Sequence, residues 1–204
     1  MVEMPKMPRI ILASRSPARR KLFKELSEEF GFDFECHTSG YEEDMSARKT
    51  APALAKFLAY KKAEFVAHTY PNSIIIGADT FGTMNGKKLG KPKSITDAKN
   101  IIRAYSESSM KVHTGVAVIS TADHGTIVEK LTDHAVTTVH FGKISEKDIE
   151  EIIQEDDILN VAGALKIEGK SGKHIHTIHG DYHNVIGLPL FQVEAMLKEM
   201  LKKV

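Results

Sequence analysis

The 204-residue sequence contains a single cysteine, Cys36, and no long hydrophobic segment. One cysteine excludes an intrachain disulfide, and Cys36 stands between Glu35 and His37, without the electropositive setting that a reactive thiolate needs. No apolar run approaches the ~20 residues of a membrane-spanning helix, and the N-terminus has no secretory hydrophobic region. We therefore expect a cytoplasmic protein with no membrane partner.

The sequence also has almost no net charge, +1 at pH 7, because 28 Lys and Arg residues face 27 Asp and Glu residues. This balance argues against a nucleic-acid polymer bound by a basic surface, although it allows a local basic pocket. The 42% hydrophobic content is typical of a soluble globular protein. We expect an N-terminal tail over residues 1–8 and a single α/β domain over residues 9–204.

Several nucleotide-binding and hydrolase motifs are absent. The lysine-rich stretch from Gly86 to Lys91 has three residues between its glycines where a Walker A motif has four, and Pro92 follows it. No Gly-x-Gly-x-x-Gly loop follows the first predicted strand, and no Gly-x-Ser-x-Gly elbow occurs. Asp79-Thr80-Phe81 lacks the second aspartate of a haloacid-dehalogenase-type phosphatase. P-loop, Rossmann, serine-hydrolase and aspartyl-phosphatase chemistry are therefore disfavoured.

Hydrophobic periodicity predicts alternating strands and helices. Strands are expected over residues 10–13, 32–37 and 74–76, and helices begin near Ser16, Thr50 and Ser94, each of which can cap a helix. Two further strands, 112–120 and 131–141, flank a turn and form an antiparallel pair. A helix after Ser145, a strand over 173–178 and a helix over 188–204 complete the order. This order favours an α/β fold with a mixed sheet.

Polar side chains follow the predicted strand over residues 74–76, just after its apolar run stops. Ile74, Ile75 and Ile76 predict a buried strand, and Asp79 and Thr80 follow closely. Ligands commonly bind where the strands of α/β sheets end, so Asp79 is a candidate site residue at a strand end. On these residues alone, a buried strand that ends in a capped turn explains the pattern equally well.

The turn after the first strand reads Ser14-Arg15-Ser16-Pro17-Ala18-Arg19-Arg20. Arginines in the first turn of a helix are unfavourable, and a bound phosphate would relieve them. The segment therefore indicates a phosphate site, with a solvated basic patch as the alternative. The consecutive acids at positions 42–44 could supply a ligand to a divalent metal or could be solvated surface.

Four histidines within ten positions suggest zinc as a further alternative: His174, His176, His179 and His183. Neither a cysteine nor a His-Glu-x-x-His helix accompanies them. Polar residues that alternate with Ile175 are also what a half-exposed strand would show. A zinc protein therefore remains a separate hypothesis.

The chain as a whole resembles the Maf family of nucleoside triphosphate pyrophosphatases. The resemblance spans nearly the full length and rests on six blocks in the same order. These blocks are Leu12-Ala13-Ser14-Arg15-Ser16-Pro17-Ala18-Arg19-Arg20, Glu42-Glu43, Leu58-Ala59-Tyr60-Lys61-Lys62-Ala63, Ile76-Gly77-Ala78-Asp79-Thr80, Gly90-Lys91-Pro92, and Ala162-Gly163-Ala164 followed by residues 178–190. Each block alone is weak, and their common order makes the resemblance specific.

The resemblance implies a mixed, elongated central sheet flanked by helices, with two lobes and a cleft, as in Maf and ITPase-like proteins. It also implies a homodimer and hydrolysis of a nucleoside triphosphate to the monophosphate and pyrophosphate, with Mg²⁺ or another divalent cation such as Mn²⁺. dTTP, UTP or modified nucleotides are the implied substrates. A nucleotide-binding regulator linked to cell-division arrest, with weak or no catalysis, is the alternative.

The resemblance also implies roles for individual residues. Glu43 and Asp79 would hold the metal, and Asp79 would position or deprotonate the attacking water, two roles that sequence cannot separate. The same two carboxylates and Lys91 form the implied catalytic set. Substrate binding is implied for Ser14, Arg19, Lys62, Thr80, Ala18 and Glu168.

Two of these positions depart from the family pattern. Ala18 stands where the branch acting on dTTP and UTP usually has an arginine, and Glu168 where the family usually has glutamine. An ionised carboxylate accepts hydrogen bonds but cannot donate them, so Glu168 cannot contact a base edge as glutamine does. Thr80 matches the dTTP/UTP branch, and the tryptophan of the 7-methyl-GTP branch is absent. The phosphate-binding residues are therefore expected to be complete, whereas base selection is open.

Overall fold

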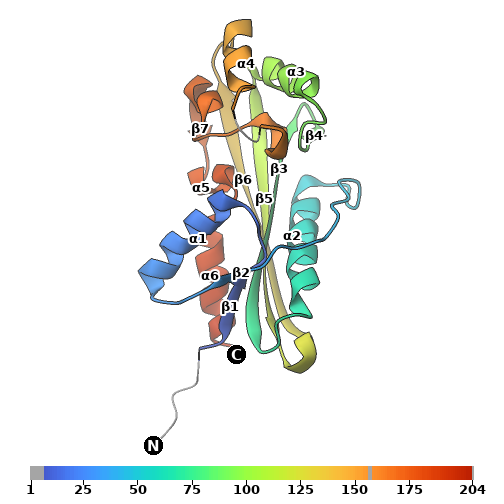
Figure 1. Cartoon of the computed structure of the whole chain (residues 1–204), viewed down its shortest axis with the longest axis vertical. Helices are drawn as coiled ribbons and strands as arrows, with labels where there is room; N and C mark the ends of the chain where they lie inside the picture. Colours follow the sequence, from blue (N-terminus) through green and yellow to red (C-terminus); the bar gives the residue numbers. More distant parts are fainter. Residues whose placement is uncertain (1–6, 156–157, 204) are drawn as a thin grey trace, which may run out of the picture.

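The computed structural model describes residues 7–155 and 158–203, and one elongated mixed sheet runs along most of its length (Figure 1). The order of the strands is β2-β1-β3-β5-β6-β7, with β4 paired to β3. β1 is parallel to β2 and β3, and every other pair is antiparallel. The strands are β1 (Arg9–Leu12), β2 (Glu35–Cys36), β3 (Ser73–Met84), β4 (Lys87–Leu89), β5 (Ser109–Thr121), β6 (Ile127–Phe141) and β7 (Ile175–His179).

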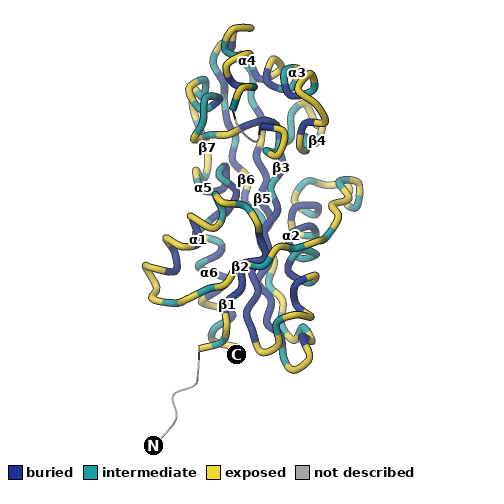
Figure 2. Tube along the Cα trace, viewed as in Figure 1, coloured by how far each residue is buried: buried dark blue, intermediate teal, exposed yellow. Residues whose placement is uncertain are grey.

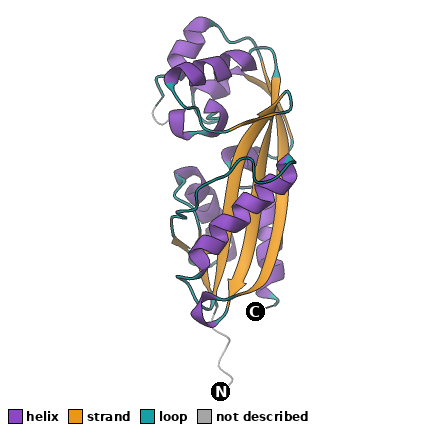
Figure 3. Cartoon of the chain, turned by 90° about the vertical axis from the view of Figure 1, so that its right-hand side faces the viewer, coloured by secondary structure: helices purple, strands orange, loops and turns teal. Residues whose placement is uncertain are grey.

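Helices flank both faces of this sheet, which confirms the predicted fold class (Figures 1 and 3). The α-helices are α1 (Pro17–Phe30), α2 (Ala51–Ala67), α3 (Ile95–Tyr105), α4 (Glu146–Ile152), α5 (Tyr182–Ile186) and α6 (Leu190–Leu201). Short 3-10 turns are η1 (Asp123–Gly125), η2 (Ile158–Asn160), η3 (Ala162–Ala164) and η4 (Lys170–His174). Within the described ranges, no helix has both the length and the apolarity to cross a membrane.

The long strands β3 and β5 are buried over most of their length (Figure 2), and alternation directs their side chains to the two faces of the sheet. Ile74 and Ile76 of β3 pack with α1 and α6, whereas Ile75 packs with the alanine-rich side of α2. A further core, which includes Tyr105 and Phe141, lies at the end of the sheet that α3 and α4 cover. The two halves of the molecule therefore have cores of their own, joined by the long strands β3, β5 and β6.

The local predictions of helix starts are confirmed. The side chains of Ser16, Thr50, Ser94 and Ser145 each accept a hydrogen bond from the backbone N–H three residues later. β4 and α5 were not predicted, and the strand predicted over residues 32–37 is limited to Glu35–Cys36. Most of the predicted N-terminal tail lies outside the described residues.

The prediction that Asp79 lies at a strand end is wrong. β3 continues to Met84, because β5 pairs with it in antiparallel register from Ile74 through Thr83. A strand does end beside Asp79, but it is β1, whose pairing with β3 stops at Ile76. Beyond Ile76 one edge of β3 is therefore free of β1, and the loops that follow β1 and β2 reach that edge.

Two glycines let α2 lie close against the sheet. A Cβ atom on Gly115 would stand 2.0 Å from the backbone oxygen of Ala55, and one on Gly77 would stand 2.2 Å from that of Ala59. Side chains at these positions would push α2 outward. The glycines thus set the distance between α2 and β3, on which the site described below depends.

We expect Gly115→Ala to lower the free energy of unfolding by about 2 kcal/mol or more, because backbone of α2 cannot yield to the added methyl group. Gly142→Ala is the matched control, since its Cβ would meet only the oxygen of His174 at 3.8 Å. Urea denaturation of both variants measures the difference. Equal stability of the two variants would contradict this account of helix packing.

Candidate active site

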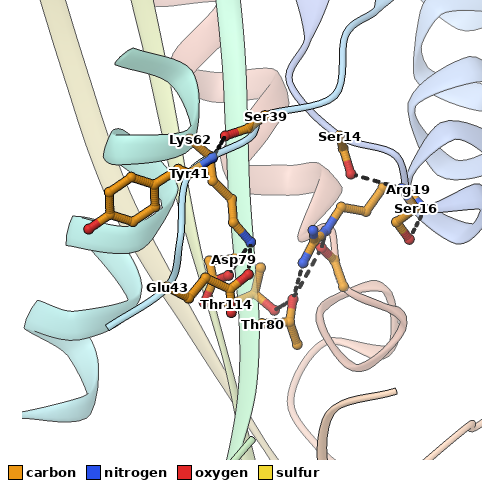
Figure 4. A network of polar contacts seen from close by, with 11 residues as sticks. Ser14, Ser16, Arg19, Ser39, Tyr41, Glu43, Lys62, Asp79, Thr80 and Thr114 are labelled. Carbon is orange, nitrogen blue, oxygen red and sulfur yellow. Dashed lines mark hydrogen bonds and ion pairs between the residues drawn. The ribbon is translucent and has the colours of Figure 1, made fainter. Parts of the chain in front are cut away.

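A lysine bridges two carboxylates at the free edge of β3 (Figure 4). The Nζ of Lys62 lies 2.5 Å from Oδ1 of Asp79 and 2.7 Å from Oε1 of Glu43. The Asp79 side chain is 3% exposed, that of Lys62 13%, and that of Glu43 38%. The group therefore extends from a buried position on β3, at Asp79, to a more open position at Glu43.

Three separate elements place these side chains. Asp79 comes from β3, Lys62 from α2, and Glu43 from the loop over residues 37–50 that joins β2 to α2. Tyr41 and Met45 of this loop pack against a small buried cluster that includes Phe81. Packing of the loop on both sides of Glu43 directs its carboxylate toward Lys62.

Charge keeps Glu43 ionised despite its partial burial. Burial by itself would raise the pKa of Glu43, but Lys62, Lys91 and Arg19 together outweigh it and leave that pKa below the ordinary value. One oxygen of Asp79, Oδ2, is buried and has no hydrogen-bond partner. Such an atom is costly to bury, and it is a free acceptor beside an ion-paired group.

A second cation, Arg19, reaches the neighbouring position on β3 from the first turn of α1. Its Nε donates to the carbonyl oxygen of Gly187 at 2.8 Å, and one terminal nitrogen donates to Oγ1 of Thr80 at 2.8 Å. Burial lowers the pKa of Arg19, whereas the charges of Asp79 and Glu43 raise it. An arginine stays protonated at neutral pH under these conditions, so Arg19 is a permanent cation beside the carboxylates.

Chemistry fixes the direction of the hydrogen bonds behind Arg19. Thr80 Oγ1 lies 2.9 Å from Oγ1 of Thr114, which lies 3.1 Å from the carbonyl oxygen of Asn184. A guanidinium can only donate and a carbonyl can only accept, and each hydroxyl has one proton. Along the shorter contacts, the chain of donors therefore runs from Arg19 through Thr80 and Thr114 to Asn184, while the carbonyl of Gly187, at 3.4 Å, is a second and more distant acceptor for Thr80.

The remaining predicted residues lie at different distances from this group. Ser14 is buried in the turn after β1, where its Oγ accepts from the N–H of Ser16 at 3.2 Å. Lys91 is exposed and acts on Glu43 through its charge. Ala18 lies in the first turn of α1, and the exposed Glu168 lies 3.7 Å from Lys21, one turn further along that helix.

Sequence reasoning missed Thr114, Asn184 and Gly187. Thr114 belongs to a strand that was predicted, but its hydroxyl is the buried link between Thr80 and Asn184. Asn184 is fully buried and donates to Thr137 and to the carbonyl of Val112. A polar residue inside an otherwise apolar strand was the available signal for Thr114.

The four histidines considered for zinc do not gather into a ligand set. His174 lies 3.8 Å from Asp148, and His183 lies 3.7 Å from Asp181. Among residues 7–155 and 158–203, no three His, Cys, Asp or Glu side chains form a group that could hold a metal. The histidine cluster in the sequence therefore does not carry over into a cluster in space.

A histidine pair lies farther along the same face of the sheet. Nδ1 of His113 is 3.0 Å from Nε2 of His134, and the His113 ring stacks on Phe81 at 5.6 Å between centroids. Burial, followed by the neighbouring charges of His134 and Lys111, lowers the pKa of His113 to about 4. Between about pH 4 and pH 6.5, His113 is therefore neutral in the folded protein but protonated in an unfolded chain.

This depressed pKa predicts a loss of stability in acid. Between an ordinary pKa near 6.5 and the folded pKa of about 4, the unfolded chain binds the proton and the native protein does not, so stability falls as pH falls. From about pH 7.5 to about pH 5 the contribution is about 2 kcal/mol. Urea denaturation of wild type and His113→Asn at both pH values tests this, and an unchanged slope in the variant would contradict it.

The donor chain behind Arg19 predicts a specific effect at Thr114. Thr114→Val should lower the free energy of unfolding by about 1–3 kcal/mol, because it leaves the buried carbonyl of Asn184 without its donor. It should also speed solvent exchange of the Arg19 Nη protons in NMR spectra, because a terminal nitrogen of Arg19 donates to Thr80 at the start of the chain. Thr114→Ser, which keeps the hydroxyl, is the control and should behave like wild type. Rapid exchange in both variants would contradict the directed chain.

Comparison with known proteins places the whole chain in one group. Residues 9–200 match the family model described as Maf-like protein. The dTTP/UTP pyrophosphatase of Alkaliphilus oremlandii (strain OhILAs) is 38% identical over 193 residues, which cover 94% of this chain and 96% of that protein. The dTTP/UTP pyrophosphatase of Bacillus cytotoxicus is 36% identical over 193 residues, covering 95% and 96% respectively.

A solved structure supports the fold independently. The HAM1 protein from Coxiella burnetii matches with a TM-score of 0.51 at 15% identity, covering 95% of this chain and all of that chain. At this identity the likeness concerns the fold alone, and it agrees with the elongated mixed sheet. On the strength of the full-length family match and these relatives, the chain belongs to the Maf family.

Proposed function

We propose that the protein is a nucleoside triphosphate pyrophosphatase, which hydrolyses its substrate to the nucleoside monophosphate and pyrophosphate. The observation that carries this proposal is the group of Lys62, Asp79 and Glu43 beside the fixed cation Arg19. Cleavage of a phosphoanhydride requires stabilisation of charge on phosphate oxygens, which the two cations would supply directly and the two carboxylates by holding a divalent cation. The names of the dTTP/UTP pyrophosphatases among the relatives point to the same reaction.

Glu43 and Asp79 fit a divalent cation. Both offer only carboxylate oxygens, which Mg²⁺ and Mn²⁺ prefer, and the buried Oδ2 of Asp79 is an acceptor without a partner. When bound, the cation would neutralise phosphate charge and lower the pKa of a bound water. Lys62 now neutralises the same two carboxylates, so a cation there would release Lys62 to the phosphates of the substrate.

The other residues would bind and orient the triphosphate. Arg19 and Lys91 supply positive charge, and Ser14 with the first turn of α1 supplies hydroxyl and backbone donors. Asp79 would hold the attacking water or take its proton. The low exposure of Asp79 keeps this carboxylate fixed against the sheet, which favours one orientation of that water.

We propose dTTP and UTP as the first substrates to examine, because Thr80 matches that branch and the relatives carry those names. Modified nucleotides come next, since Ala18 and Glu168 depart from the family pattern. We also propose that the protein is a cytoplasmic homodimer that binds no nucleic-acid polymer. Light scattering of the purified protein tests the oligomeric state.

A nucleotide-binding regulator with weak or no catalysis, linked to cell-division arrest, is the second candidate. The observation that favours it is the Lys21–Glu168 pair, which places a carboxylate near the first turn of α1. Such a carboxylate could hinder a base or hold it without turnover. Tight nucleotide binding with no product, even with Mn²⁺, would support this candidate over the enzyme.

A panel of canonical and modified nucleoside triphosphates with Mg²⁺ tests the proposed function. Pyrophosphate and the monophosphate should form in equal amounts from at least one substrate. Orthophosphate as the product would exclude the proposed reaction. Because each substrate is tested separately, the panel also measures base selection.

Asp79→Asn should lower kcat/KM by about 10³-fold, because it removes the charge that holds the metal and the attacking water while it keeps the size of the side chain. The circular dichroism spectrum should match that of wild type. The isosteric amide is preferable to alanine, since Asp79 lies in the buried middle of β3 and a smaller residue would leave a cavity. Near-normal turnover by a folded Asp79→Asn variant would show that the site lies elsewhere.

A further inference from the structure

Lys88 of β4 is bonded to the loop that carries Glu43. Its Nζ donates to the carbonyl oxygens of Met45 at 2.8 Å and Arg48 at 2.9 Å. Both acceptors belong to residues 37–50, whereas β4 is paired to the far end of β3. Figure 1 shows this loop beside β4, above the N-terminal end of α2. One side chain therefore ties the Glu43 loop to a hairpin of the other half of the molecule.

The loop has few other polar ties of its own. Apart from the Glu43–Lys62 ion pair and the bonds of His37 at its start, its bonds are local. Asp44 accepts from the N–H and hydroxyl of Ser46, and Ala47 N–H donates to the carbonyl of Asp44. Apolar packing holds Tyr41 and Met45. A long loop without helix or strand needs such anchors to keep one conformation. The two bonds from Lys88 are charge-assisted, and they fall just after Glu43.

The neighbouring lysines, Lys87 and Lys91, do not bond to the Glu43 loop in this way. The side chain of Lys87 is exposed and has no hydrogen bond or ion pair with any residue in the described part of the chain. Lys91 is also exposed, and its charge acts on Glu43. Two of the three N–H donors of the Lys88 ammonium group already bond to carbonyl oxygens. Lys88 is therefore poorly placed to bind a phosphate.

We propose that Lys88 is a positioning residue that holds Glu43 beside Asp79 and thereby sets the affinity of the site for a divalent cation. This rests on the proposed function, in which Glu43 and Asp79 hold that cation. Without the tie, the loop would sample other conformations, and only the fraction of molecules with Glu43 in place would bind metal well. If that fraction is about a tenth, the apparent affinity falls about tenfold.

The test compares Lys88→Met with Lys87→Met, which removes the same charge one residue away. In metal-free protein, deuterium exchange over residues 41–48 should be faster in Lys88→Met than in wild type and Lys87→Met. Mn²⁺ binding, followed by electron paramagnetic resonance, should weaken about tenfold in Lys88→Met and remain unchanged in Lys87→Met. Lys88→Arg keeps donors at this position and should restore part of both properties.

The outcomes separate this inference from the proposed function. Equal exchange or equal Mn²⁺ affinity in the two methionine variants would overturn the role of Lys88 alone. Binding of Mn²⁺ that survives Asp79→Asn, or no binding by wild type, would overturn the metal site itself, and the role of Lys88 with it. A thermal melt of each variant shows whether it is folded, which separates loss of the Lys88 hydrogen bonds from loss of the fold. If Lys88→Met does not fold, deuterium exchange and Mn²⁺ binding are compared between Lys88→Arg and wild type instead.

Discussion

The ion pair between Lys62 and the buried Asp79 is the interaction on which the rest of the site depends. A carboxylate in the middle of a sheet would be costly without a partner, and even a paired one contributes little net stability. Lys62 can reach it only because α2 lies close against β3 and β5, at the glycines Gly77 and Gly115. The close packing of α2 thus positions the Lys62–Asp79 pair, which the fold does not need for its stability.

Sheet topology explains how residues from separate loops reach this ion pair. β1 stops at Leu12, paired with Ile76, while β3 and β5 continue. The free edge of β3 beyond that point receives the turn after β1 and the loop after β2. Arg19 and Glu43 therefore meet Asp79 and Thr80 at this free edge, as expected of a ligand site at the carboxyl end of a parallel strand.

Local signals predicted a good part of this arrangement. Helix caps such as Ser16 and Ser94 depend on residues three positions apart, so the sequence shows them directly. The position of Asp79 within β3 depends on pairing with β5, more than thirty residues away, and the apolar run could not reveal it. The partners Thr114 and Asn184 and the tie from Lys88 come from still more distant pairings. Composition and spacing do not record such contacts.

The ammonium group of Lys62 lies between Glu43 and Asp79, and we propose that a divalent metal ion replaces it there when metal and nucleotide bind. A crystal structure with Mn²⁺ and a non-hydrolysable α,β-imido analogue of UTP tests it most directly, because the anomalous signal locates the metal. We predict Mn²⁺ on the oxygens of Glu43 and Asp79, with Nζ of Lys62 moved from these carboxylates to a phosphate oxygen. Mn²⁺ bound elsewhere, with Lys62 still paired to Asp79 and Glu43, would contradict the account.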